Sequence, residues 1–136
     1  MGEVIEEAVM LFDGYDIEST GGVDKTVIET AEIELGIKFS DEFIEYLNVY
    51  GTVELNSSEL FGLGIKGYRN IVRATNKERS LSENFPKNCV VIYNLGINSV
   101  LILLCEDGCV YEYTPRSMKK IYDTFNKWIL DEFVSY

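Results

Sequence analysis

The stretch from Ile28 to Gly51, I-E-T-A-E-I-E-L-G-I-K-F-S-D-E-F-I-E-Y-L-N-V-Y-G, decides the fold of this chain. Apolar residues recur at helical spacing before Gly36 and again after Ser40, which predicts two helices joined by a short crossover. Gly36 suits the left-handed position that ends a helix. Ser40 is expected to cap the second helix, with Asp41 and Glu42 in its first turn, where the helix dipole favours negative charge.

Further helices are predicted on both sides of this pair. One is expected over Glu3–Phe12 and another over Asn70–Leu81, because each has an apolar stripe at helical spacing. Thr114 followed by Pro115 is typical of a helix start and predicts a last helix from that point. Its expected apolar stripe consists of Met118, Ile121, Tyr122, Phe125, Trp128, Ile129 and Phe133. The polar, glycine-rich segment 13–22 lacks the ligand spacing of a calcium-binding EF-hand and is interpreted as a plain loop.

Strand patterns occupy much of the remaining chain. Val53 and Leu55 alternate with polar residues, nearly continuous apolar runs cover Cys89–Tyr93 and Val100–Cys105, and Cys109–Thr114 is the last of the expected strands. Asp107 and Gly108, between the last two of these strands, are a strong signal for a hairpin turn. These runs favour antiparallel hairpins.

Gly62, Gly64 and Gly67 spell the dinucleotide-binding pattern G-x-G-x-x-G. That pattern is meaningful only after a strand, before a helix, and about twenty residues ahead of an acid at the end of a parallel strand. Here the distance leads to Glu83, which stands just before Phe85-Pro86 and ahead of any strand signal. We therefore interpret the glycines as turn residues between short strands.

The three cysteines, Cys89, Cys105 and Cys109, lie in apolar strand-like runs of a chain whose amino terminus lacks the basic region of a secretory signal. An odd, sparse count in this setting favours reduced thiols in a cytosol. A two-residue turn at Asp107-Gly108 would put Cys105 and Cys109 on opposite faces of the sheet, whereas a three-residue loop would bring them opposite one another. We expect no disulfide and a cytoplasmic location.

The net charge is −11 and is unevenly placed. Residues 1–59 contain fifteen acids and two lysines, which give −13, whereas residues 60–136 carry +2. An acidic half repels nucleic-acid phosphate and acidic membranes and attracts basic partners. The alternative interpretation is a solvated surface with no partner.

No histidine is present. Its absence removes the commonest general base, the commonest metal ligand and any Ser-His or Cys-His nucleophile. Cys109 lies beside Glu106 and Asp107, which disfavour a reactive thiolate. We expect no enzyme, no cofactor and no metal site.

The core stretch resembles the SUKH superfamily, named for fungal cell-wall-synthesis regulators and found among bacterial immunity proteins. The matching positions are Ile28, Glu32, Leu35, Gly36, Phe39, Phe43, Leu47 and Gly51. The hairpins V-V-I-Y-N-L-G-I-N and E-D-G-C-V-Y-E-Y and the ending F-N-K-W-I are also similar to the family. Ser40 replaces the usual proline, and Tyr50-Gly51-Thr52 replaces the usual Asn-Gly-Gly.

The resemblance implies an α+β fold in which a single domain, residues 1–136, packs an antiparallel sheet of about five or six strands against about four helices. It also implies binding without catalysis, as an immunity protein that neutralises a polymorphic or contact-delivered toxin, with a nuclease-type toxin domain as the expected class. The alternative is a non-catalytic regulatory or scaffolding module that binds a cellular protein.

A basic toxin would be met by carboxylates of the acidic half, because complementary potentials favour association. The expected cluster is Asp41, Glu42, Glu45, Glu54 and Glu59, on the grounds that the helix start and the following strand share a rim. Nucleic acid and membranes are not expected as partners, and pairing of the chain with itself as a homodimer stays open.

Overall fold

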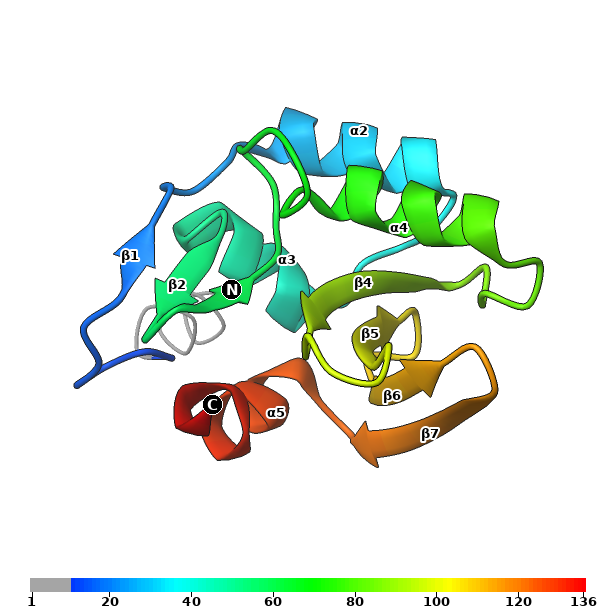
Figure 1. Ribbon diagram of the computed structural model, residues 1–136. Helices are drawn as coiled ribbons and strands as arrows, with labels where there is room; N and C mark the ends of the chain where they lie inside the picture. Colours follow the sequence, from blue (N-terminus) through cyan, green and yellow to red (C-terminus); the bar gives the residue numbers. More distant parts are fainter. Residues whose placement is uncertain (1–10) are drawn as a thin grey trace.

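The computed structural model describes residues 11–136 (Figure 1). The helix expected over Glu3–Phe12 falls almost entirely outside this range. The described helices are α2 (Lys25–Leu35), α3 (Asp41–Val49), α4 (Ile71–Leu81), α5 (Phe125–Asp131) and the 3-10 helix η1 (Phe133–Ser135). The described strands are β1 (Glu18–Ser19), β2 (Val53–Leu55), β3 (Ser58–Leu60), β4 (Cys89–Asn94), β5 (Leu101–Cys105), β6 (Val110–Thr114) and β7 (Ser117–Tyr122).

The helix pair α2–α3 forms as the sequence predicts. The Asp24 carboxylate accepts the N–H of Val27 at 3.1 Å and so caps α2. Gly36 ends α2 in the left-handed region, at φ 68°, and donates its N–H to the carbonyl of Glu32 at 2.8 Å. Ser40 stands at the capping position of α3, but its hydroxyl caps no N–H. The carboxylates in the first turn of α3 are therefore its expected source of terminal stabilisation.

The α+β class is confirmed, and the strands divide between two antiparallel sheets. One sheet has the order β1-β2-β3 and the other the order β4-β5-β6-β7. Figure 1 shows α2 and α4 side by side along one side of β4, with α3 in the centre and α5 beside the end of β7. The interpretation of residues 13–22 as a plain loop is wrong in one respect, because this segment contains strand β1.

One core connects these layers. Phe43, Tyr46 and Leu47 of α3 are completely buried, as are Phe125 and Trp128 of α5. The buried Tyr46 hydroxyl donates toward the carbonyls of Leu60 and Phe61, so it ties α3 to the end of β3. A net gain of about 1 kcal/mol is typical of such a bond, and an unpaired buried partner costs more.

The last helix starts later than predicted. Thr114 ends β6, and its hydroxyl accepts the N–H groups of Arg116 and Ser117 at 3.2 and 3.1 Å. The chain then returns as β7, and the helix begins only after Thr124, whose side chain accepts the N–H of Lys127. The expected helix start at Thr114 is wrong, because a threonine that caps a helix closes a tight turn with the same acceptor.

This shift changes the expected apolar stripe. Phe125, Trp128, Ile129 and Phe133 are buried as predicted. Met118 lies on β7 and is 41% exposed. The core contribution of the carboxy-terminal segment therefore comes from α5 and η1.

The expectation of reduced thiols is wrong for two of the three cysteines. Cys89 and Cys105 lie directly opposite one another on β4 and β5 and are joined by a disulfide. Cys109 is free. The hairpin uses the three-residue loop, because Cys105 donates its N–H to the carbonyl of Cys109 at 3.1 Å. Cys105 nevertheless bonds to the strand on its other side, a pairing that hairpin geometry alone does not reveal.

Candidate functional site

A row of glutamates crosses the three-stranded sheet. Glu18 of β1 lies opposite Glu54 of β2, which in turn lies opposite Glu59 of β3. The neighbouring Val53 and Leu60 are buried, and successive side chains on a strand point to opposite faces, so the glutamates occupy the outer face. Like charges directly opposite one another destabilise a sheet. We call Glu18, Glu54 and Glu59 the glutamate ladder.

Glu59 holds an exposed aromatic ring in place. The Tyr68 hydroxyl lies 2.6 and 2.7 Å from the two carboxylate oxygens of Glu59, and Arg69 Nε lies 3.4 Å from Oε2. The hydrogen bond to Glu59 raises the pKa of Tyr68, and partial burial adds to this shift. The Tyr68 ring also meets the ring of Phe61 edge to face, with centroids 6.2 Å apart. Tyr68 is 63% exposed, so a fixed aromatic surface stands beside the ladder.

The loop that carries Tyr68 is closed at its base by Gly62. Gly62 donates its N–H to the carbonyl of Arg69 at 3.0 Å and accepts the N–H of Ile71 at 2.9 Å. A Cβ at Gly62 would overlap the carbonyl oxygen of Gly51, so only glycine allows this approach. The glycine pattern therefore serves loop closure. A dinucleotide-binding βαβ unit is absent from the described residues, since both sheets are antiparallel.

The three acids expected on α3 belong to its first two turns, beside α5 and the β5–β6 hairpin. Asp41 is exposed at the first position of α3, and Glu45 is half-buried one turn later. The carboxylate of Glu42 accepts the N–H of Asn126, in the first turn of α5, at 3.0 Å. Ser40, just before this turn, lies near the β5–β6 hairpin, since a Cβ at Gly108 would be 3.8 Å from its own.

The five expected carboxylates thus form two groups. The structure brings Glu54 and Glu59 together across two strands and leaves Asp41, Glu42 and Glu45 on α3. Sequence reasoning missed Glu18, the third member of the ladder. Strand β1 has two residues and forms by pairing with β2, so no local periodicity could have indicated it.

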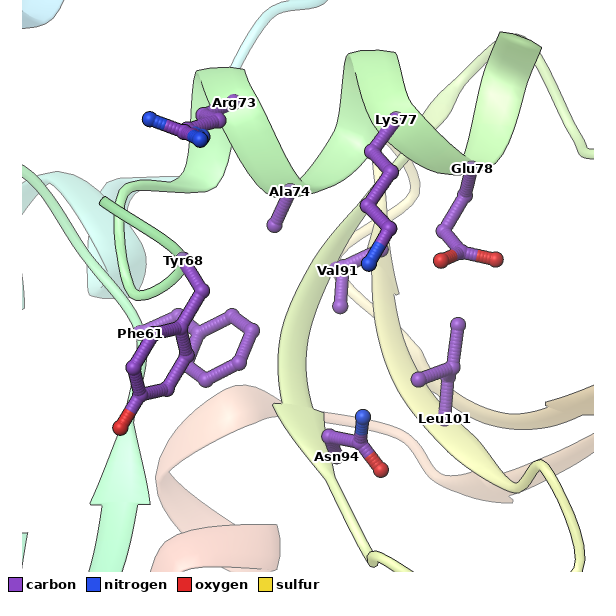
Figure 2. A pocket seen from close by; sticks show the side chains of 9 residues that line it. All are labelled: Phe61, Tyr68, Arg73, Ala74, Lys77, Glu78, Val91, Asn94 and Leu101. Carbon is purple, nitrogen blue, oxygen red and sulfur yellow. The ribbon is translucent and has the colours of Figure 1, made fainter. Parts of the chain in front are cut away.

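A hollow of about 250 Å³ opens beside Tyr68, between α4 and the strands β4 and β5 (Figure 2). Its rim carries polar side chains of α4 and β4. Figure 2 shows the ammonium of Lys77 extending over the hollow and the Arg73 guanidinium pointing away from it. The buried residues that line it are Phe61, Ala74, Val91 and Leu101.

A second hollow adjoins the first on the side of Glu59. It has a volume of about 330 Å³ and shares Phe61, Tyr68 and Asn94 with its neighbour. Glu59 lines this second hollow. The apolar floor beneath α4 and the carboxylate of Glu59 therefore line two adjoining hollows that share Tyr68.

Among residues 11–136, no group of three or more His, Cys, Asp or Glu side chains is placed to hold a metal ion. Burial and the charge of Asp107 raise the pKa of the Cys109 thiol, which disfavours a nucleophilic thiolate. No helix within residues 11–136 has the length and apolar character that crossing a membrane requires.

Comparison with known proteins gives a match to a family model. No curated protein matches the chain. The model of the SUKH_5 family, described as SMI1-KNR4 cell-wall, matches residues 1–134. The wider SUKH family is known for immunity proteins of polymorphic toxin systems and is generally non-catalytic. Since the match spans nearly the whole chain, this protein belongs to the SMI1-KNR4 cell-wall (SUKH_5) family.

Proposed function

We propose that this chain is an immunity protein that binds and neutralises a toxin domain with a basic, nuclease-type surface. Family membership supports the immunity role. The net charge of −11 supports a basic partner, because complementary potentials speed association and select against wrong partners. A nuclease binds phosphate through cationic side chains, and an acidic domain seated on those side chains blocks access of the nucleic acid.

The glutamate ladder is the observation that carries this proposal. Three carboxylates are aligned across neighbouring strands although adjacent like charges weaken a sheet. Arg69 lies 3.4 Å from Glu59 and offsets part of this charge. A cationic partner would relieve the remaining repulsion among the glutamates on binding. The relief of this repulsion would add to the binding free energy of the complex.

Asp41, Glu42 and Glu45 form the second acidic group of the proposed surface. Glu42 is engaged with the first turn of α5, so its carboxylate also has a structural role. Asp41 is exposed and is therefore the α3 residue best placed to meet a partner. The ladder is expected to contribute more, because its charges stand together.

Co-expression in toxin-sensitive cells tests the proposal. The toxin domain to test is a toxin-like carboxy-terminal domain sought in the reading frame beside the gene for this chain. Cells that make both proteins should survive, and survival should fall when Glu54→Lys and Glu59→Lys are combined. Glu83→Lys is the control, since Glu83 is an exposed acid after α4 that lies outside the ladder. Death of cells that contain the folded wild-type chain would reject the immunity role and favour a regulatory or scaffolding module.

Association kinetics test the acidic surface separately. The association rate of the wild-type chain with a catalytically inactive toxin domain should fall steeply as salt is raised, because salt screens exposed charges. Glu54→Gln should lower the rate and flatten its salt dependence. An association rate that ignores salt would exclude the ladder as the steering surface.

A further inference from the structure

We infer that the hollow beside Tyr68 is an anchor pocket for one bulky apolar side chain of the toxin, presented next to a basic side chain that lies over the glutamate ladder. This inference rests on the immunity function proposed above and names the chemistry of the contact. It concerns the hollow lined by Phe61, Ala74, Val91 and Leu101, which the acidic surface alone does not use.

The size and floor of the hollow favour a single side chain. Its volume of about 250 Å³ is below the range of roughly 300–1,000 Å³ typical of pockets that enclose whole small molecules. Ala74 lines the hollow, and its short side chain points into it (Figure 2), so a longer side chain at this position would occupy part of the hollow. Buried pockets that receive one apolar or aromatic anchor are where most binding energy at a protein interface is concentrated.

Tyr68 forms a rigid wall between the pocket and the ladder. Its hydroxyl is fixed by Glu59, and its ring is fixed by the edge contact with Phe61. A ring held in this way loses little conformational entropy on binding. Tyrosine is among the residues that most often dominate interface energetics.

Charge complementarity sets the order of the partner's residues. Glu59 lines the second hollow, which adjoins the first and shares Phe61, Tyr68 and Asn94 with it. A basic side chain of the partner that lies over the ladder is therefore a neighbour of the apolar side chain that fills the pocket. On the far rim Lys77 and Glu78 stand side by side on α4, so their opposite charges offset one another and that rim offers a cation less attraction than the ladder does. The surface thus selects a loop with its basic residue on the ladder side of the anchor.

Binding kinetics of designed variants with the inactive toxin domain test the pocket. Ala74→Leu fills the space, and Tyr68→Ala removes the wall. Each should raise the dissociation rate about tenfold or more while leaving the association rate nearly unchanged, because the pocket acts after electrostatic encounter. Tyr68→Phe keeps the ring and should have a much smaller effect.

Asn76→Leu is the matched control for Ala74→Leu. It adds the same apolar side chain to α4 at an exposed position outside the hollow, and its dissociation rate should equal that of the wild type. Thermal unfolding of each variant checks the fold. If Ala74→Leu fails to fold, Tyr68→Ala carries the test, because Tyr68 is exposed.

The outcomes separate the pocket from the function. If both Ala74→Leu and Tyr68→Ala dissociate like the wild type while Glu54→Gln still slows association, the pocket is overturned and the acidic surface stands. If the wild type does not bind the toxin domain, the immunity function fails and the pocket assignment fails with it. A double-mutant cycle between Ala74→Leu and serine substitutions of apolar toxin residues should show coupling at one residue that neighbours a basic one.

Discussion

Tyr68 and Glu59 share one hydrogen-bonded unit on the surface, with the phenol oxygen 2.6 and 2.7 Å from the two carboxylate oxygens. The two residues come from different elements: Glu59 is the middle residue of β3, and Tyr68 lies in the loop before α4. Their contact joins the acidic row on the sheet to the apolar hollow under α4. The partner-binding surface proposed here depends on that junction.

The first prediction concerns the ionisation of Tyr68. The neighbouring carboxylate disfavours phenolate and raises the pKa of Tyr68, so this ring should ionise at higher pH than an ordinary tyrosine. The contact then stabilises the fold fully below the ordinary pKa and loses this contribution as pH rises through the raised one. Glu59→Gln should move the Tyr68 transition to lower pH. The difference between ultraviolet titrations of the wild type and Tyr68→Phe isolates this one ring, and an unmoved transition in Glu59→Gln would contradict the assignment.

The second prediction concerns the cost of the glutamate ladder. Glu54 faces carboxylates on both sides, so Glu54→Gln removes two repulsive pairs and should increase the free energy of unfolding by about 0.5–1 kcal/mol. Urea denaturation at low salt measures this gain, which should shrink at high salt. Glu83→Gln is the control and should change stability little. A variant that is less stable than the wild type would show that Glu54 has an attractive partner within the chain.

The third prediction compares two glycines of one loop. Gly62→Ala forces a Cβ against the Gly51 carbonyl and should cost about 3 kcal/mol or more of unfolding free energy. Gly67 has φ 96° and open space around it, so Gly67→Ala should cost only about 1–2 kcal/mol from backbone strain. Thermal or urea unfolding of the two variants gives the order. Equal costs would mean that the loop moves away from Gly51 freely.

The fourth prediction concerns the thiols. Alkylation of the folded chain without reductant should add one group, on Cys109, because Cys89 and Cys105 are bonded. The reaction should be slow at neutral pH, since burial and Asp107 raise the pKa of Cys109 and lower its thiolate fraction. Asp107→Asn should accelerate it. Mass spectrometry counts the adducts, and three adducts on the unreduced chain would exclude the disulfide.

The sequence predicted those parts of the fold that local signals control. Gly36 ends α2 because its backbone is left-handed, as the sequence predicts. Asp107-Gly108 correctly predicts the β5–β6 hairpin. The segment after Thr114 was assigned wrongly, because the same hydroxyl acceptor serves a helix cap and a tight turn, and tertiary pairing with β6 decided between them. The residues from Thr114 to Ser117 contain no local sequence signal that predicts the pairing of β7 with β6.

The candidate site shows the same division. Glu54 could be named from the strand pattern of Val53 and Leu55, and Glu59 from the charge of the amino-terminal half, although the strand that carries Glu59 was not predicted. Glu18 could not, because β1 exists only as an addition to β2. The hollow also escaped sequence analysis, since its floor combines residues from the loop after β3 and from α4, β4 and β5, which no linear motif brings together.

The backbone contact between Gly51 and Gly62 also bears on how such a chain can diversify. The hydrogen bonds that close the loop at Gly62 are made at its base, and none of them involves the exposed tip residue Lys66. Residues can therefore be inserted or deleted at that tip without opening the core, as is usual for exposed loop tips. Under the proposed immunity function, changes of loop length at this tip would alter the presentation of Tyr68 to a changing toxin, while the base at Gly62 stays constant.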